Sequence, residues 1–467
     1  MTITDSAGLA VSTTSGEALA AYERGVDLFL RWRAGAIEAL DDATNIDPRF
    51  ALASCTKAYI AWRMGRVDLA AAAAQQAVVL ADARHERERR HVQAVDALRR
   101  GDAAVGYRVL EEIAAEDPTD RIAVRIVGLN CITQGNYRGG IDLARQSLAA
   151  SPEEPQYLTM LGFFLEQCGY NDEGLEVSLR SLAKDPTSLY TYHAVGHAYQ
   201  ARGDYRNALE TFERAASLER YAHLLWHLAE AHAILGEARM TRDYWASTAP
   251  PLPLYERIAL LWRLEILGHA PKDEAVWQDL AAQAERLLVH AEFLTTWMHH
   301  WIGVAFARVG RWGLAKQQLE RLQRLPAGQA SGHWSTLGAA LLEGEMAVVR
   351  GDDAEAVRLM APGVEGIDRM GGGSREQKDI FRDVFLELHR RLGRADEVIA
   401  LAHRRLLANP YHVPSLAALV WAYERNGDAA LHRQACRQLV LRAQEAGCAA
   451  DTPEVVAARN ALDEAPR

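Results

Sequence analysis

Apolar residues recur along this chain at the three- and four-residue spacing that places them on one face of an α-helix. In the stretch that begins at Thr191, the apolar positions of two successive helices are Val195, Ala198 and Tyr199, then Ala208, Phe212 and Ala215. No segment requires the strict apolar–polar alternation of a β-strand. The pattern therefore predicts an all-α chain.

Glycines interrupt the helical pattern at a fixed period. Five follow one another at intervals of 34, 34, 34 and 33 residues, namely Gly101, Gly135, Gly169, Gly203 and Gly236. Prolines repeat in phase at Pro118, Pro152 and Pro186, and the glycine signal continues less regularly at Gly65, Gly310, Gly351, Gly393 and Gly427. A left-handed glycine that ends one helix and a proline that opens the next unit predict a repeated helix–turn–helix.

A helix–turn–helix unit of 34 residues resembles the tetratricopeptide repeat. The small and aromatic packing positions of that repeat are matched in order by Gly196, Tyr199, Ala208, Phe212 and Ala215. The resemblance implies a tetratricopeptide-type helical solenoid, strongly curved or closed and irregular in the middle. We expect one superhelix over residues 1–467.

Within this superhelix we expect four parts: N-terminal helical hairpins over 20–100, regular repeats over 101–246, irregular helical repeats over 247–370 and C-terminal helical repeats over 371–467. Two breaks set the last two parts apart. The segment that starts at Ser247 reads STAPPLPLYER and predicts a bend or loop. The segment that starts at Arg369 reads RMGGGSREQKDIF, and its three glycines cannot lie inside a stable helix.

The acidic composition of the chain argues against one class of binding partner. Lys and Arg total 52 against 62 Asp and Glu, and such an acidic surface repels phosphate, which argues against nucleic acid. We expect no signal peptide, and no membrane span because no stretch approaches the roughly 20 apolar residues that one requires. Five scattered cysteines form no CxxC pair, which is typical of reduced thiols in a cytoplasmic protein.

The phrases between the repeats resemble the tetratricopeptide repeat protein 38 family and its bacterial relatives over nearly the whole chain. Examples are RERRHVQA, YHAVGH, HLLWH, LLWRLEILG and GGSREQKDIF. The matching polar residues are Arg87, Glu88, His91, Glu166, His193, His197, His223, Trp226, His227, Arg263, Ser374, Gln377 and Asp379. The resemblance implies an architecture and candidate residues, and it implies no particular activity.

The chain departs from that family at a few positions. A His-Asp pair of the family is replaced here by Gly128 and Leu129, an arginine by Lys378 and a later histidine by Glu387. If the His-Asp pair takes part in chemistry, this chain lacks that chemistry or performs a different version of it.

Two pairs of histidines stand out as candidate site residues. His193 and His197 lie four residues apart and leave one helix face, and His223 and His227 do the same in the next repeat. The first helices of tetratricopeptide repeats line the inner, concave surface, so we expect the four imidazoles to share a patch there with Trp226. Converging histidine and aromatic side chains are typical of a ligand site.

Three roles are open for these histidines. As metal ligands, His193, His197, His223 and His227 would suit zinc or iron. Without a metal, His193, His197 and His227 are candidate catalytic residues for general acid–base chemistry. The third role is structural, with the histidines specifying how repeats stack. The predicted ligand-binding residues are His223, Trp226, Glu166, Arg263, Gln377 and Asp379.

Other polar motifs allow simpler interpretations. Of His299 and His300 only one is expected to face the groove, because adjacent helical residues diverge by about 100°. We interpret Arg87, Glu88 and His91 as a charged helix face that ties two repeats together. Ser374 and Gln377 have the spacing of a helix-capping box.

We therefore predict a cytoplasmic protein whose histidine- and tryptophan-lined concave pocket binds a small-molecule ligand, with catalysis and a divalent metal left open. The rival hypothesis is a non-catalytic adaptor that binds a partner's peptide or helix in the groove. The two hypotheses differ in the expected width of the groove. A small-molecule pocket would be occluded by the C-terminal repeats, whereas a groove for a peptide or helix would stay open and more than about 10 Å wide.

Overall fold

The computed structural model describes residues 3–80, 85–247, 249–270, 272–289, 294–325 and 333–463. Over these residues the chain is almost entirely helical, which confirms the predicted all-α class. It divides into two compact units. The first unit runs to Ala194 and includes Leu294, and the second comprises Val195–Val289 and the residues from Thr295 onward.

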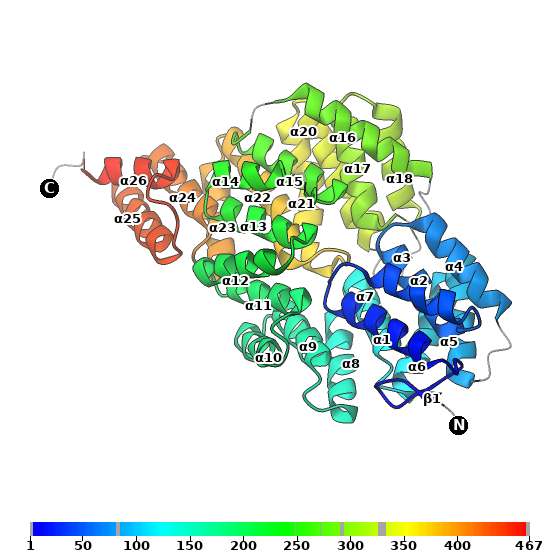
Figure 1. The fold of residues 1–467 in the computed structure, drawn as a ribbon. Coiled ribbons are helices and arrows are strands. Elements are labelled where there is room, and N and C mark those ends of the chain that lie inside the picture. Colours follow the sequence, from blue (N-terminus) through cyan, green and yellow to red (C-terminus); the bar gives the residue numbers. More distant parts are fainter. Residues whose placement is uncertain are drawn as a thin grey trace. The chain divides into compact units, whose positions relative to one another are not determined.

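The first unit consists of helical hairpins that follow a short N-terminal segment (Figure 1). Its elements are β1 (Ile3–Thr4), β2 (Ala10–Val11), α1 (Gly16–Leu30), α2 (Ala36–Ile46), α3 (Ala51–Arg63), α4 (Val67–Val79), α5 (Glu86–Arg99), α6 (Ala103–Glu116), α7 (Arg121–Gln134), α8 (Tyr137–Ala150), α9 (Pro155–Gln167) and α10 (Asn171–Lys184). Helix α11 (Leu189–Ala201) contains the boundary between the units.

The second unit continues the series of hairpins. Its further elements are α12 (Tyr205–Leu218), α13 (Ala222–Ile234), α14 (Ala238–Trp245), α15 (Leu254–Ile266), α16 (Glu274–Leu287), α17 (Thr296–Arg308), α18 (Trp312–Gln323), the π-helix η2 (Trp334–Gly338), α20 (Ala339–Val349), α21 (Asp353–Glu365), the 3-10 turn η3 (Ile367–Arg369), α22 (Arg375–Arg391), α23 (Ala395–Ala408), α24 (Val413–Arg425), α25 (Ala429–Glu445) and α26 (Pro453–Asp463). None of the helices in the described ranges is long and apolar enough to span a membrane.

The periodic glycines end helices as predicted. All ten, from Gly65 to Gly427, have φ angles between 68° and 88°, the left-handed region in which a side chain would be strained. At the end of α7, the N–H of Gly135 donates to the carbonyls of Cys131 and Ile132. The Asn136 side chain then caps α8, so one glycine and one cap turn the chain into the next helix.

A small β-ladder corrects the expectation that the chain needs no strand. Ile3–Thr4 pairs antiparallel with Ala10–Val11, with Ile3 opposite Val11. The reason is a tight turn, in which the Asp5 carboxylate accepts the backbone N–H groups of Ala7 and Leu9, and Gly8 has a φ of 79°. This turn brings the two short segments together.

Both predicted breaks are present. The STAPPLPLYER segment, apart from Thr248, which lies outside the described residues, connects α14 to α15 and contains a cis Ala249–Pro250 bond. The glycine-rich segment precedes α22, which starts with a complete capping box formed by Ser374 and Gln377. The predicted cap is confirmed.

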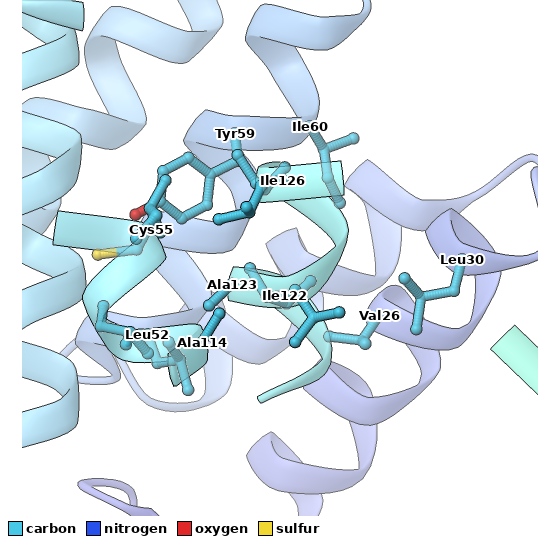
Figure 2. Close-up of a cluster of buried hydrophobic side chains, with 14 of the residues drawn as sticks. Val26, Leu30, Leu52, Cys55, Tyr59, Ile60, Ala114, Ile122, Ala123 and Ile126 are labelled. Atoms are coloured by element: carbon cyan, nitrogen blue, oxygen red, sulfur yellow. The ribbon is translucent and has the colours of Figure 1, made fainter. Parts of the chain in front are cut away.

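The core of the first unit lies between its hairpins. Figure 2 shows side chains of α1, α3 and α7 that meet there, among them Val26, Cys55, Tyr59 and Ile122. These positions repeat every three or four residues along each helix, as expected for one buried face.

Helix α22 lies inside the second unit. Buried residues occur around most of its circumference, including Glu376, Lys378, Phe381 and Asp383, and it packs against α15. A helix with charged groups buried on several sides must find partners for them in the surrounding helices. The C-terminal part of the unit also returns to its first hairpins.

Residues near the end of α25 contact the first hairpins of the second unit. Ala446 packs with Tyr205, Ala231 and Leu235, the Cys448 thiol lies 3.0 Å from the Leu235 carbonyl oxygen, and the Ala449 N–H donates to Glu237 at 2.7 Å.

Replacing Gly196 by alanine tests the packing of the repeat. A Cβ at this position in α11 would lie 2.2 Å from the Phe212 ring in α12, far inside van der Waals contact. Gly196→Ala is therefore expected to destabilise the second unit by about 1–3 kcal/mol in denaturant unfolding. The control is Gly313→Ala in α18, where the new Cβ would meet no atom within 4 Å, so stability should stay level or rise. Equal stability of the two variants would contradict the assigned packing role.

Candidate functional site: a histidine cluster against helix α22

Residues of three successive repeats meet helix α22 in the second unit. His197, Glu230 and Arg263 follow each other at intervals of 33 residues on α11, α13 and α15, and His223 and Glu256 have the same spacing. Equivalent positions of successive repeats form rows, so each row presents its side chains in one direction. We call His197, His223, His227, Glu256 and Glu376 the histidine cluster.

The centre of the cluster is a pair of imidazoles. His197 Nε2 and His227 Nε2 are 3.1 Å apart, and both side chains are fully buried. On the other side of its ring, His197 Nδ1 lies 3.0 Å from the carboxylate of Glu376 in α22. Burial alone would raise the pKa of Glu376, but the charge of His197 lowers it to about 2. The Glu376 carboxylate is thus ionised and lies beside the His197 ring.

A second carboxylate orients the third imidazole. His223 Nδ1 lies 2.7 Å from Glu256 Oε1, and this oxygen also accepts a hydrogen bond of 3.2 Å from the Gln377 amide. The His223 ring is 4.8 Å from that of His227 and stacks on Trp226, with the planes at 6°. The His223 side chain is 24% exposed, so it connects the buried pair to solvent.

Trp226 is buried at the edge of the cluster. Its indole Nε1 has no hydrogen-bond partner among the described residues. Indole N–H groups usually find a partner when buried, so this donor is an unsatisfied polar group within the described part of the chain.

Helix α22 contacts α11 and α15 through charged and amide side chains. Its Glu376, Gln377 and Asp383 contact His197, Glu256 and Arg263 respectively. Side-chain contact of this kind leaves no space of helix diameter between α22 and these three residues. Around the cluster, α22 therefore packs directly against α11 and α15.

A buried ionic network adjoins the cluster. Arg263 pairs with Asp383, which also pairs with Arg405 and lies 3.6 Å from His412. Burial alone would raise the pKa of Asp383, but Arg263 and Arg405 hold it well below its usual range. The predicted ligand residue Arg263 thus has a carboxylate partner within the chain.

Glu230 is the other carboxylate near Arg263. It accepts a hydrogen bond of 2.6 Å from Gln200, and its second oxygen lies 3.9 Å from Arg263. Burial raises its pKa to about 8, against the opposing charge of Arg263. Asp379, another predicted ligand residue, lies further along α22 and pairs with Arg382 at 2.8 Å.

Two predicted site residues belong to the first unit. His193 is buried and stacks against Phe163, with 5.6 Å between ring centroids, and lies close to Trp32. Glu166 is fully buried at the end of α9, where it accepts a hydrogen bond of 2.7 Å from Gln167.

The adjacent histidines of α17 diverge as expected. His299 Nδ1 lies 2.8 Å from Gln318 in α18, whereas His300 Nε2 lies 2.8 Å from Glu345 in α20. Both are buried. His300 is surrounded by Trp301, Trp334 and Phe381.

The Arg87 motif ties segments together, as predicted for this charged helix face, and it is buried. Arg87 pairs with Asp120 and Asp5 at 2.7 Å each, and His91 Nε2 lies 3.0 Å from Asp120. Glu88 accepts the Ser12 N–H. His91, Asp120 and Glu88 are fully buried, because the N-terminal segment covers this side of α5.

Sequence reasoning missed two members of the cluster, Glu256 and Glu376. Glu256 carries a usable signal, since it stands one period of 33 residues after His223. Glu376 lies inside the SREQ phrase between two residues that had been singled out, but nothing local indicates that it contacts a helix 179 residues earlier.

Two departures from the expected family pattern lie on α22. Burial lowers the pKa of Lys378 to about 8, although Asp368 opposes this effect. Glu387 is buried and accepts a hydrogen bond of 2.6 Å from Arg390.

Comparison with known protein families identifies a tetratricopeptide repeat at residues 189–221, which form α11, the following turn and α12. This is the stretch in which the sequence matched the repeat's packing positions. The coarse assignment to tetratricopeptide-type architecture is confirmed.

Several solved structures are similar to the chain at low identity. The Cut9–Hcn1 hetero-tetramer of the APC/C has 13% identity and a TM-score of 0.48, over 99% of this chain and 79% of that one. Yeast Tom70 has 10% identity and a TM-score of 0.40, over 96% and 95%. The human IFIT1 dimer with PPP-AAAA has 14% identity and a TM-score of 0.38, over 90% and 89%.

Proposed function

We propose that this chain of tetratricopeptide-type hairpins binds a small-molecule ligand at the histidine cluster of its second unit, with a divalent metal ion held by His197 and His227. The observation that carries the proposal is the 3.1 Å separation of the two Nε2 atoms, with Glu376 on the opposite nitrogen of His197. Two buried imidazole nitrogens at this distance can share a metal ion or a hydrogen bond.

The distances suit zinc. Two imidazole nitrogens bound to one tetrahedral zinc at about 2.0–2.1 Å are roughly 3.3 Å apart. A histidine that binds a metal through one nitrogen commonly donates its other N–H to a carboxylate, and Glu376 occupies that position. Imidazole ligands favour zinc over magnesium or calcium.

The surroundings favour a small ligand over a peptide. Helix α22 packs directly against His197, Glu256 and Arg263, which leaves no room for a peptide between them. The half-buried His223 and the indole N–H of Trp226 lie beside the buried pair. A small molecule reaching His223 could bind Trp226 and complete the coordination of a metal. The predicted roles of His193 and Glu166 as further site residues stay predictions.

Elemental analysis of protein purified without a histidine tag tests the metal. We expect about one zinc per chain, lost in His197→Ala and in His227→Ala. A chelator should lower the thermal midpoint of the wild-type protein, because bound metal stabilises the folded state. Glu376→Gln should weaken metal binding about 10- to 100-fold while leaving the stoichiometry unchanged at excess metal.

The matched control is His232→Ala. His232 is a buried histidine of the same helix as His227, but its partner is Glu237 at 2.5 Å, outside the cluster. This variant should keep its metal. Wild-type protein with no stoichiometric metal and unchanged stability in chelator would eliminate the metal.

The same geometry supports a metal-free alternative, in which one imidazole of the pair donates to the other and His197 and His227 act as general acid and base. Metal analysis separates the two. If His197→Ala and His227→Ala also leave the thermal shifts of a metabolite library unchanged, the histidines are structural and the ligand proposal fails.

We also propose membership in the tetratricopeptide repeat protein 38 family. Support comes from His197, His223, His227 and Gln377, which come from distant phrases of the resemblance and join one cluster. A binding screen that recovers a peptide at this unit and no small molecule would favour the adaptor hypothesis.

A further inference from the structure

A polar cavity of about 510 Å³ lies in the first unit, separate from the histidine cluster. One side is formed by α1, with Glu23, Asp27 and Arg31. The opposite side is formed where α7, α9 and α11 begin, and includes Arg121 and Glu154. A cavity of this size is in the range that small-molecule ligands occupy.

The arginines of the cavity wall are already paired. Arg31 lies 2.6 Å from Asp185 and 3.1 Å from Asp27. Arg121 pairs with Asp27 and lies 3.5 Å from Glu23. An anionic ligand would have to displace a carboxylate from one of these guanidinium groups.

Backbone N–H groups at the starts of α7 and α11 are in part already bonded. Asp120 caps α7 through the Ala123 N–H, and Ser188 accepts the Thr191 N–H at the start of α11. Helix α9 begins with Pro155, which has no N–H to offer. The positive ends of the helices therefore provide little to an anion.

Negative charge is in excess in the wall. Its four carboxylates, Glu23, Asp27, Glu154 and Asp185, face two guanidinium groups. The Glu154 carboxylate makes no hydrogen bond or ion pair with the residues that the structure describes, and as the N-cap of α9 it forms no side-chain cap. A cation can therefore pair with Glu154 without breaking an existing ion pair, unlike with Asp27 or Asp185.

Besides the excess of negative charge, the cavity is lined by buried polar groups that have no hydrogen-bond partner among the described residues. Gln156 is 8% exposed, and neither its amide oxygen nor its amide nitrogen has a hydrogen-bond partner among the described residues. The hydroxyls of Tyr157 and Tyr190 are likewise unpartnered in the described ranges, at 1% and 2% exposure. All three residues line the cavity. Buried groups of this kind are costly unless a ligand or water satisfies them.

We propose that this cavity binds a small organic cation, an amine whose ammonium group pairs with Glu154 and whose N–H donors reach Gln156 and the two tyrosine hydroxyls. The two excess negative charges of the wall favour a diamine over a monoamine. The residues of this cavity belong to the first unit, and those of the histidine cluster belong to the second.

Isothermal titration of the full chain in 150 mM NaCl tests the proposal with three probes: 1,4-diaminobutane, butylamine and succinate. We expect saturable binding of one diamine per chain, at least tenfold weaker binding of butylamine, and no binding of succinate. Glu154→Gln should weaken diamine binding at least tenfold, because it removes the unpaired charge and keeps the shape of the side chain.

Two further variants make the test specific. Tyr157→Phe removes a hydroxyl that has no partner, so it should fold normally and weaken the diamine severalfold. Glu38→Gln, at an exposed carboxylate of α2 away from the cavity, should bind like the wild type. Succinate binding, diamine binding that is unchanged in Glu154→Gln, or an equal loss in Glu38→Gln would overturn the proposal.

Discussion

Arg263→Met is expected to destabilise the second unit by about 3–5 kcal/mol. Arg263 is fully buried, and its guanidinium pairs with Asp383 and lies 3.9 Å from Glu230. Methionine fills a similar volume but leaves the Asp383 carboxylate without this cation, and breaking a buried ion pair by removing one partner carries a penalty of that size. Denaturant unfolding followed by tryptophan fluorescence measures the loss, since most of the fully buried tryptophans lie in this unit.

Arg358→Met is the matched control. Arg358 forms an exposed pair with Glu355 in α21, with 68% of the arginine side chain accessible. Exposed ion pairs contribute little to stability, so this variant should unfold like the wild type. If Arg263→Met unfolds at the same denaturant concentration as Arg358→Met, the buried network has no net stabilising role.

The wild-type protein is expected to lose stability between pH 4.5 and 8 because Glu230 must ionise in a buried position, and Glu230→Gln should not show this loss. Burial raises the pKa of Glu230 from 4.5 to about 8, so the folded protein holds a proton there that the unfolded chain releases above pH 4.5. The contribution of this group is therefore greatest below pH 4.5, declines as pH rises to 8, and is constant above that. Each pH unit in the interval is worth about 1.4 kcal/mol, so the loss over the 3.5 units reaches roughly 5 kcal/mol.

The measurement is the difference in unfolding free energy between Glu230→Gln and wild type from pH 4.5 to 9. Glutamine does not titrate, so the difference should grow in favour of the variant up to pH 8 and then stay level. Taking the difference cancels the titration of groups that do not interact with Glu230, whereas the charges of Arg263, Glu376 and Asp379, which act on Glu230, are part of the measured difference. A difference that stays flat across this range would show that Glu230 is ionised in the folded protein.

The repeat architecture could be predicted from sequence because its determinants are local. Each periodic glycine requires a left-handed φ at its own position, and Gly196 and Phe212 meet within one hairpin. The repeat period of 33 to 34 residues that separates the glycines also separates polar residues in equivalent positions of successive repeats. His197, Glu230 and Arg263 keep their spacing of 33 through the STAPPLPLYER break, so their common direction was predictable in principle.

The partners of those rows were not predictable, because they come from one distant helix. Glu376 reaches His197, and Asp383 reaches Arg263, only because α22 lies inside the second unit. No local pattern specifies where a helix packs after so many residues. The cavity of the first unit escaped prediction for a similar reason, since Glu23 and Glu154 are polar residues with no motif around them.

The position of α22 also has a consequence for the order in which the protein assembles. The helices α11 and α15 are synthesised long before residues 375–391, yet the carboxylates that lie against His197 and Arg263, those of Glu376 and Asp383, come from that helix. During synthesis these groups must stay hydrated, so the repeats of the second unit cannot close tightly on their own. Contacts of such long sequence separation form slowly. The histidine cluster is therefore expected to become complete only when the C-terminal part of the chain has left the ribosome.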